Sequence, residues 1–281
     1  MIFDLKYTSA QGNTLNLTDN ADFFLKDVDG LTAADVDLST VTIALADGDE
    51  VTNTKGKARS INLYLEFKQG VNVELAKRRI LAAIKPKNRG RLDFTYNGLH
   101  LQIEGVTQAI TMPRFSNDVI MQVTIYCGFP YWKDATKIIS EISTILDNFH
   151  FEMAVNASNP IIFGKILGQA MNVINNSGDV PTGMMIHIIA TGDNVVNPKI
   201  ERTIDGAFFV INTTMNTGDE IIINTNKGQK DVLKNGTSII NLVGSGSTWF
   251  QLEVGENEFT VTDQSGNNSL ITNFEYKRAF I

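Results

Sequence analysis

The sequence predicts a mainly β protein with one or two helices, made of an N-terminal β-domain that bears one helix and a C-terminal β-sandwich. Apolar and polar residues alternate with period two in segments such as 61–67, which is typical of half-buried strands. Glycine-containing turn pairs such as Asn97-Gly98 and Asn235-Gly236 separate segments of this kind. The length of 281 residues suits two ordinary domains.

The N-terminal elements follow from local patterns. Strands are expected over residues 2–7, 14–17, 91–96, 99–103 and 119–126. The alternating segments 41–45 and 61–67 predict a long hairpin, because the polar, glycine-containing stretch 47–57 lies between them. A helix is expected over residues 73–84, where apolar residues recur every three to four positions after a possible Asn72 cap and before Pro86.

Three segments are expected along the chain. Residues 1–133 form the N-terminal domain, residues 134–150 a helical linker and residues 151–281 the sandwich. Asp134 can cap the linker helix, which places Ile138, Ile142, Ile145 and Leu146 on one side. In the last segment, turn markers recur every 8–12 residues or so, as in an all-β sandwich.

Acidic and basic residues occupy separate segments within the first half of the chain. Residues 19–50 hold nine acids and one base, whereas residues 55–91 hold eleven bases and two acids. One reading is two solvated faces of one domain. The other is that each block meets the opposite block on a neighbouring copy, because complementary patches orient association.

Catalytic and metal-binding motifs are absent from the sequence. The single cysteine, Cys127, excludes an internal disulfide and any CxxC site. The three histidines form no HExxH pair, and no P-loop or GxSxG motif occurs. The acids at 27–29 and 47–50 do not complete a calcium loop and are interpreted as turns. We therefore expect a protein that is not an enzyme and has no cofactor and no metal.

The sequence also bears on location and on glycan binding. No signal peptide and no apolar stretch of about 20 residues is apparent, so we expect synthesis in a cytoplasm and no membrane contact.

Trp249 precedes Phe250, and in a strand one of the two would face outward. An outward Trp249, or Trp132, could stack on a sugar or contact a partner. A core position for Trp249 is the simpler interpretation.

An ordered set of turn-and-strand segments resembles the distal tail proteins (Dit) of siphophages, which are hub subunits of the tail baseplate. In the second half these segments lie at residues 176–182, 192–200, 217–223 and 247–257. In the first half they are the turn at 29–31, the hairpin start at 47–48, the helix end at 84–87 and residues 92–98. The resemblance extends over essentially the whole chain.

The resemblance implies a structural virion protein, assembled in the bacterial host cytoplasm and placed at the distal end of the tail. It implies a homo-hexameric ring with galectin-like β-sandwiches on its outside. The partners it implies are the tail tube protein, the tail-associated hub or lysin protein and a receptor-binding protein. DNA passes through the central channel. The helical segment at 134–146 is not a feature that the family leads us to expect.

A head-to-tail ring needs two different, complementary surfaces on each subunit. We expect the 41–67 hairpin to reach over a neighbour as an arm. The candidate interface residues are Asp47, Asp49, Glu50, Lys55, Lys57 and Arg59. An alternative places basic residues at the channel wall, facing DNA. The alternative functions are a carbohydrate-binding adhesin that uses Trp249 or Trp132 and, last, a hydrolase.

Overall fold

The structure is a computed structural model that describes residues 3–44, 47–112, 119–142, 144–147, 164–167, 172–265 and 269–281. The chain divides into two compact units. Unit 1 contains residues 1–136 and 279–281, and unit 2 contains residues 137–278. Each unit has its own hydrophobic core.

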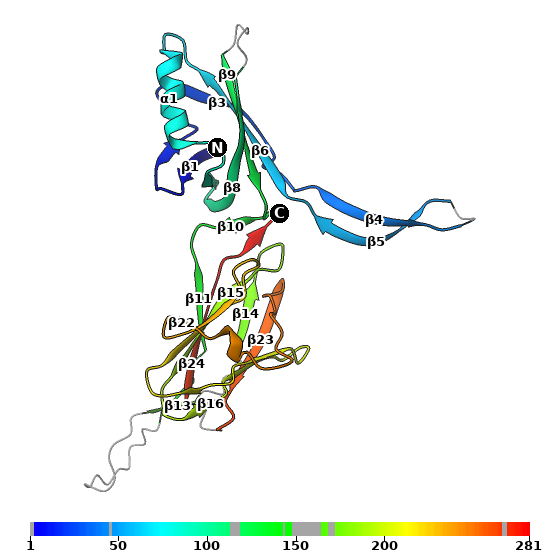
Figure 1. The fold of residues 1–281 in the computed structure, drawn as a ribbon, viewed down its shortest axis with the longest axis vertical. Coiled ribbons are helices and arrows are strands. Elements are labelled where there is room, and N and C mark those ends of the chain that lie inside the picture. The colour runs from blue at the N-terminus through cyan, green and yellow to red at the C-terminus, as the bar shows by residue number, and fades with distance from the viewer. Residues whose placement is uncertain are drawn as a thin grey trace. The chain divides into compact units, whose positions relative to one another are not determined.

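Unit 1 has a nine-stranded antiparallel sheet and a separate two-stranded sheet, β4–β5 (Figure 1). The large sheet has the order β2-β1-β7-β8-β9-β6-β3, and β10 pairs with both β8 and β25. The strands of unit 1 are β1 (Phe3–Ser9), β2 (Thr14–Asn16), β3 (Phe23–Asp29), β4 (Val36–Thr42), β5 (Asp49–Gly56), β6 (Arg59–Phe67), β7 (Arg89–Tyr96), β8 (Leu99–Thr111), β9 (Ile120–Cys127), β10 (Trp132–Asp134) and β25 (Ala279–Phe280).

One α-helix occurs in the described part of the chain, α1 (Val73–Ala83). The Asn72 side chain accepts a hydrogen bond from the Leu75 N–H, which caps the helix as expected. Ala76 and Ile80 are buried in the same core as the inward side chains of the large sheet. The helix over 73–84 is thus confirmed. No helix in the described ranges is long and apolar enough to cross a membrane.

The hairpin expected between residues 41–45 and 61–67 is wrong in its pairing. β4 instead pairs with β5, so that residues 49–56, expected in the connecting loop, form the second strand. β6 pairs with β3 and β9 inside the large sheet. The alternation in β6 reflects a core face, and strands that bury a face pair with each other. Leu45 of the expected first strand lies outside the described residues.

Unit 2 contains two larger antiparallel sheets, with the orders β11-β24-β15-β20-β21-β22 and β14-β23-β17-β18. Two short pairs, β12–β13 and β16–β19, accompany them. The strands are β11 (Ile138–Ile142), β12 (Thr144–Asp147), β13 (Gly164–Leu167), β14 (Asn172–Asn176), β15 (Met184–Ala190), β16 (Val195–Val196), β17 (Lys199–Arg202), β18 (Phe208–Val210), β19 (Thr214–Met215), β20 (Glu220–Asn224), β21 (Asp231–Lys234), β22 (Thr237–Ser238), β23 (Gly255–Thr262) and β24 (Leu270–Tyr276), with one 3-10 turn, η1 (Ile240–Leu242).

The two larger sheets of unit 2 share one core. Phe259 of β23 stacks on Phe274 of β24 with ring centroids 5.1 Å apart, and these strands belong to different sheets. Along β15 and β24, buried and half-buried residues alternate, as sandwich strands require. The mainly β fold that the sequence predicted is therefore confirmed.

The helix expected over residues 134–146 is wrong. The described part of this segment holds the end of β10, then β11 and β12. β11 pairs with β24 along its whole length, from Ile138 opposite Tyr276 to Ile142 opposite Thr272. Isoleucine is β-branched and favours a strand wherever a neighbouring strand supplies hydrogen bonds. Residues 148–150 of the expected linker lie outside the described ranges.

Unit 2 is inserted between two adjacent strands of unit 1. The chain leaves unit 1 after β10 and re-enters it at β25. These strands pair with each other, with Trp132 opposite Phe280 and Lys133 opposite Ala279. The last residues of the chain therefore complete the sheet to which its first strand belongs.

A turn carboxylate in unit 2 predicts an acid-sensitive stability. Hydrogen bonds from the Asn216 N–H and the Asn235 amide, and an ion pair with Lys234, lower the pKa of Asp219 to about 2. Because this pKa lies below the unfolded value of about 4, the carboxylate stabilises the fold above about pH 4, and this contribution is lost as the pH falls toward about 2.

We therefore expect Asp219→Asn to lower the melting temperature at neutral pH. The difference from the wild type should shrink between about pH 4 and about pH 2. Scanning calorimetry across this range measures both effects. A constant difference between the two proteins at every pH would contradict the assignment.

Candidate functional site

The β4–β5 ribbon, residues 36–56, is exposed along nearly the whole of both strands, and we call it the arm. Every residue of β4 and β5 is exposed except Gly56, which is half-buried. Figure 1 shows the ribbon extending away from the large sheet of unit 1. An isolated two-stranded ribbon is marginally stable in water, so its apolar surface is suited to contact with another molecule.

The two faces of the arm differ in character. Residues paired across an antiparallel ladder lie on the same face, and the register therefore sorts the side chains. The uncharged stretch of one face consists of Val36, Leu38, Thr40, Val51 and Thr54. The opposite face carries Asp37, Ser39, Val41, Glu50, Asn53 and Lys55. A register shift between Ser39 and Thr40 adds one residue to β5, and a bulge of this kind increases the local twist.

The base of the arm is fixed to unit 1 through backbone contacts. The Lys57 N–H donates to the Asp35 carbonyl at 2.8 Å, which closes the ribbon at its base. The Trp132 indole N–H donates to the Leu31 carbonyl at 3.3 Å. Gly30 has a φ of +84°, and a Cβ added there would lie 2.3 Å from the Ser60 carbonyl oxygen. The segment that leads into the arm is therefore held against β6.

Arg59 does not lie on the arm surface. It is 4% exposed, and its Nη1 donates to the Leu31 carbonyl at 3.3 Å and the Gly30 carbonyl at 3.5 Å. Its guanidinium lies 6.0 Å from the Trp132 ring centroid. Burial lowers the pKa of Arg59, and its Nε and Nη2 have no hydrogen-bond partner among the described residues. Arg59 therefore fixes the base of the arm and is not an exposed interface charge.

The other candidate interface residues are exposed. Asp47, Asp49 and Glu50 lie at the far end of the arm, and Lys55 lies nearer its base. Asp49 accepts a hydrogen bond from the Thr42 hydroxyl at 2.9 Å. Lys57 forms an ion pair of 2.8 Å with Asp37 in its own chain.

Trp249 is half-buried against the unit 2 core, whereas its neighbour Phe250 is buried. Its ring meets Phe209 edge-on at 4.7 Å, and the Lys230 ammonium lies 5.5 Å from its centroid. A sugar that stacks on an aromatic ring needs a free ring face. These contacts occupy the ring of Trp249, so they do not favour it as a glycan platform.

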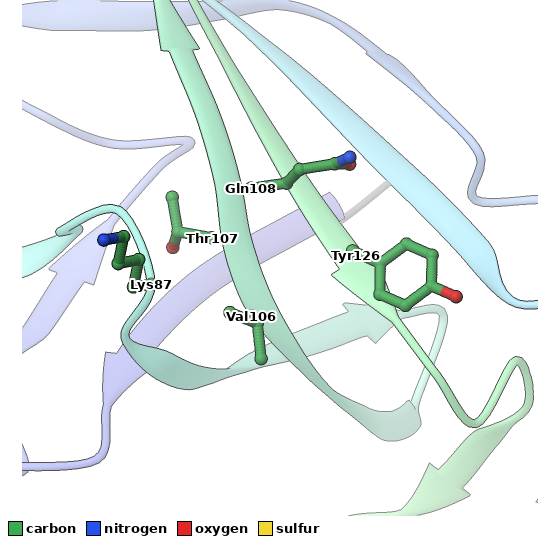
Figure 2. A pocket seen from close by; sticks show the side chains of 5 residues that line it. All are labelled: Lys87, Val106, Thr107, Gln108 and Tyr126. Atoms are coloured by element: carbon green, nitrogen blue, oxygen red, sulfur yellow. The ribbon is translucent and has the colours of Figure 1, made fainter.

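A shallow, open cleft on unit 1 is not visible in the sequence patterns. It has a volume of about 360 Å³ and is lined by Lys87, Val106, Thr107, Gln108 and Tyr126. Figure 2 shows Lys87 and Thr107 on one side of β8, with Gln108 and Tyr126 on the other. The ladder between β8 and β9 shifts register between Thr107 and Ala109. Because this bulge depends on the register of the pairing between β8 and β9, no local sequence signal predicts it.

The titratable groups of the described residues do not form a reactive centre. Burial raises the pKa of the Cys127 thiol to about 11, so the thiol is protonated and unreactive at neutral pH. The Arg202 guanidinium lowers the pKa of Asp205 to about 2, and both side chains belong to one turn. Within the described ranges, no group of three or more His, Cys, Asp or Glu side chains is placed to hold a metal ion.

Comparison with known proteins relates the C-terminal part of the chain to a family. Residues 177–280 match the family model of the siphovirus-type tail component, C-terminal domain. These residues make up most of unit 2 and reach β25. A search of curated protein sequences gives no match.

Two kinds of solved structure share the fold. The Dit protein (gp 19.1) of SPP1, described as a paradigm of the hub adsorption apparatus in phages that infect Gram-positive bacteria, matches with a TM-score of 0.73 at 15% identity, over 100% of both chains. The activated baseplate of phage p2, with calcium or with strontium, matches with a TM-score of 0.53 at 12% identity, over 99% of this chain and 98% of that one. The family model and the shared fold together confirm the resemblance to distal tail proteins.

Proposed function

We propose a role for this chain from one premise: residues 177–280 form a siphovirus-type tail component C-terminal domain, and the whole chain has the fold of a distal tail protein. The chain is then a structural, non-enzymatic subunit of a phage tail, located in the virion at the distal end of the tail. Six copies form a hub ring. The ring connects the tail tube to the tail-associated hub or lysin protein and the receptor-binding apparatus, and DNA passes through its channel.

The observation that carries this proposal is the combination of the two units in one chain. The family model of the tail component domain matches residues 177–280, which make up most of unit 2. Unit 1 adds an arm whose side chains are exposed on both faces. Exposed apolar residues on the arm include Val36, Leu38 and Val51, each more than half exposed. These three residues share one face of the arm, and exposed apolar residues gathered on one face are typical of a protein–protein interface.

The arm supports a head-to-tail ring. In such a ring, each subunit contributes one surface and receives a different one from its neighbour. The arm of one copy would contribute Asp47, Asp49, Glu50 and Lys55. Arg59 would act indirectly by holding the base of the arm, and Lys57 by its ion pair with Asp37. The alternative that basic residues face DNA in the channel predicts salt-dependent binding of duplex DNA by the purified protein.

The mass and the shape of the assembly test whether the chain forms a ring. We expect light scattering of the purified chain to give six times the mass of one subunit, about 31.0 kDa each. Negative-stain microscopy should give sixfold rings with a central hole. A protein that remains a monomer at every concentration, with both units folded by circular dichroism, would contradict the hub proposal.

A further inference from the structure

We propose that the cleft beside Lys87 receives the acidic end of the arm, residues 47–50, from a second copy of this chain. This inference rests on the proposed ring and assigns it a specific contact. The cleft and the arm belong to the same unit, so every subunit carries one of each. A contact between the arm of one copy and the cleft of the next is the head-to-tail arrangement that closes a ring.

The cleft has polar groups that its own chain leaves unsatisfied. Thr107 is 1% exposed, and its hydroxyl has no hydrogen-bond partner among the described residues. A buried hydroxyl without a partner costs free energy. Lys87 is exposed, and none of the described carboxylates lies within ion-pair distance of its ammonium. Figure 2 shows these two side chains on the same side of β8. A carboxylate is the ligand that suits an ammonium beside a hydroxyl.

The backbone of Lys87 adopts a strained conformation, and no side-chain contact of Lys87 among the described residues accounts for it. Its φ is +69°, in the left-handed region that glycine and asparagine adopt most readily. The Lys87 N–H donates to the Thr107 carbonyl at 2.9 Å, and the Thr107 N–H donates to the Asn88 carbonyl at 3.1 Å. These bonds hold Lys87 at the cleft in a conformation that glycine would adopt with less strain. Backbone strain of this kind is concentrated at functional sites.

The arm supplies the matching charge. Residues 43–54 contain three acids, Asp47, Asp49 and Glu50, and no base. All three acids are exposed. β4 has seven residues and, at roughly 3.3 Å per residue, is about 23 Å long. Because both strands are exposed along this length, the arm does not fold back onto its own unit, and its acidic end is available to another copy.

Three exposed bases without an ion pair among the described residues follow one another closely in sequence, and one of them, Lys87, lines the cleft. Elsewhere in the basic block, Lys57 pairs with Asp37 and Arg79 pairs with Asp22, whereas Lys55 lies on the arm itself. Lys85, Lys87 and Arg89 follow α1, and all three are exposed. Within the described part of the chain, no ion pair engages them. The complementary surface for the acidic end of the arm therefore lies at the cleft rather than along the whole basic block.

A cross-linking experiment with two separate chains tests the contact. One chain carries Asp47→Cys and the other carries Lys87→Cys, and the two are mixed and oxidised. We expect a disulfide-linked dimer of the two different chains, because the contact joins separate copies. Arg78→Cys in place of Lys87→Cys is the matched control, since Arg78 is also an exposed base of unit 1, on α1. The native Cys127 is buried, so the wild-type chain should give no dimer.

Substitution of Lys87 separates assembly from folding. Lys87→Gly should raise the melting temperature of the monomer by about 2–4 °C, because it relieves the left-handed backbone. The same variant should weaken assembly, so that the dissociation constant of the assembly rises by about tenfold or more. Lys87→Glu should weaken assembly further, and Asp47→Lys in the same chain should restore part of the loss.

The outcomes distinguish this contact from the ring. Two results would overturn the cleft contact and leave the hub proposal intact. One is sixfold rings in which positions 47 and 87 of different chains do not cross-link. The other is sixfold rings whose dissociation constant is unchanged by Lys87→Glu. A chain that never assembles overturns both. If Lys87→Glu leaves assembly unchanged but abolishes binding of duplex DNA, the cleft faces nucleic acid and the proposed contact is wrong.

Discussion

A chain without the arm is expected to fold but to remain a monomer. In this variant, Asn-Gly replaces residues 36–56. The hydrogen bond from the Lys57 N–H to the Asp35 carbonyl then closes a two-residue turn of the kind that Asn-Gly favours. Because the strands of the arm bury no side chain, the free energy of unfolding should change by less than about 1 kcal/mol. Assembly should be lost, since the exposed apolar face of the arm is removed.

Light scattering and thermal unfolding of the same sample check both parts of this result. A matched control keeps the arm and changes Val173→Ser, which removes an exposed apolar residue from unit 2. The control should assemble as the wild type does. Rings of normal size from the armless chain would exclude the arm from the interface.

A second large effect is expected from Gly30→Ala. The methyl group would lie 2.3 Å from the Ser60 carbonyl oxygen and 3.3 Å from the Ile61 Cα, and the residue has a φ of +84°. A backbone neighbour cannot move aside as a flexible side chain can. We expect a loss of about 3 kcal/mol or more in the free energy of unfolding, from the left-handed conformation and the overlap together.

Gly48→Ala is the matched control for Gly30→Ala. Gly48 has a φ of +90°, but an added Cβ would meet nothing within 4 Å. It should therefore cost only about 1 kcal/mol. Urea denaturation of both variants gives the two values, and their difference measures the overlap alone. Equal costs would mean that the segment leading into the arm is not held tightly against β6.

The sequence predicted elements well where the determining contacts are local. α1 is one example, because Asn72, the apolar spacing and Pro86 all lie within one segment. The sequence failed at residues 134–146, where isoleucines recur at helical spacing but the partner strand, β24, lies more than 120 residues further along the chain. Spacing alone does not reveal a distant strand that supplies hydrogen bonds.

The sequence predicted only part of the arm, again because the pairing between strands is not visible in a local pattern. A projecting hairpin was expected, but its second strand was assigned to residues 61–67 in place of 49–56. Residues 52–55 are polar and have no apolar alternation, because a strand exposed on both faces needs none. The alternation in β6 marks a core strand, and pattern reasoning paired the two alternating segments instead.

Composition suggested the candidate interface residues, and the structure shows where they lie; that they form an interface stays a prediction. The opposite charge blocks singled out Asp47, Asp49, Glu50 and Lys55, and all four are exposed. Arg59 belongs to the same basic block but is buried beside Trp132. The cleft at Lys87 depends on a left-handed residue and on a bulge opposite β9, and neither feature is visible in composition.

Because unit 2 is inserted between β10 and β25, the two units are completed in a fixed order during synthesis. A ribosome makes β1 to β10 first, then all of unit 2, and only afterwards the residues of β25 that pair with Trp132 and Lys133. Until then, β10 lacks one of its two neighbours in the sheet. A nascent chain therefore completes its N-terminal unit only after its C-terminal unit has been translated.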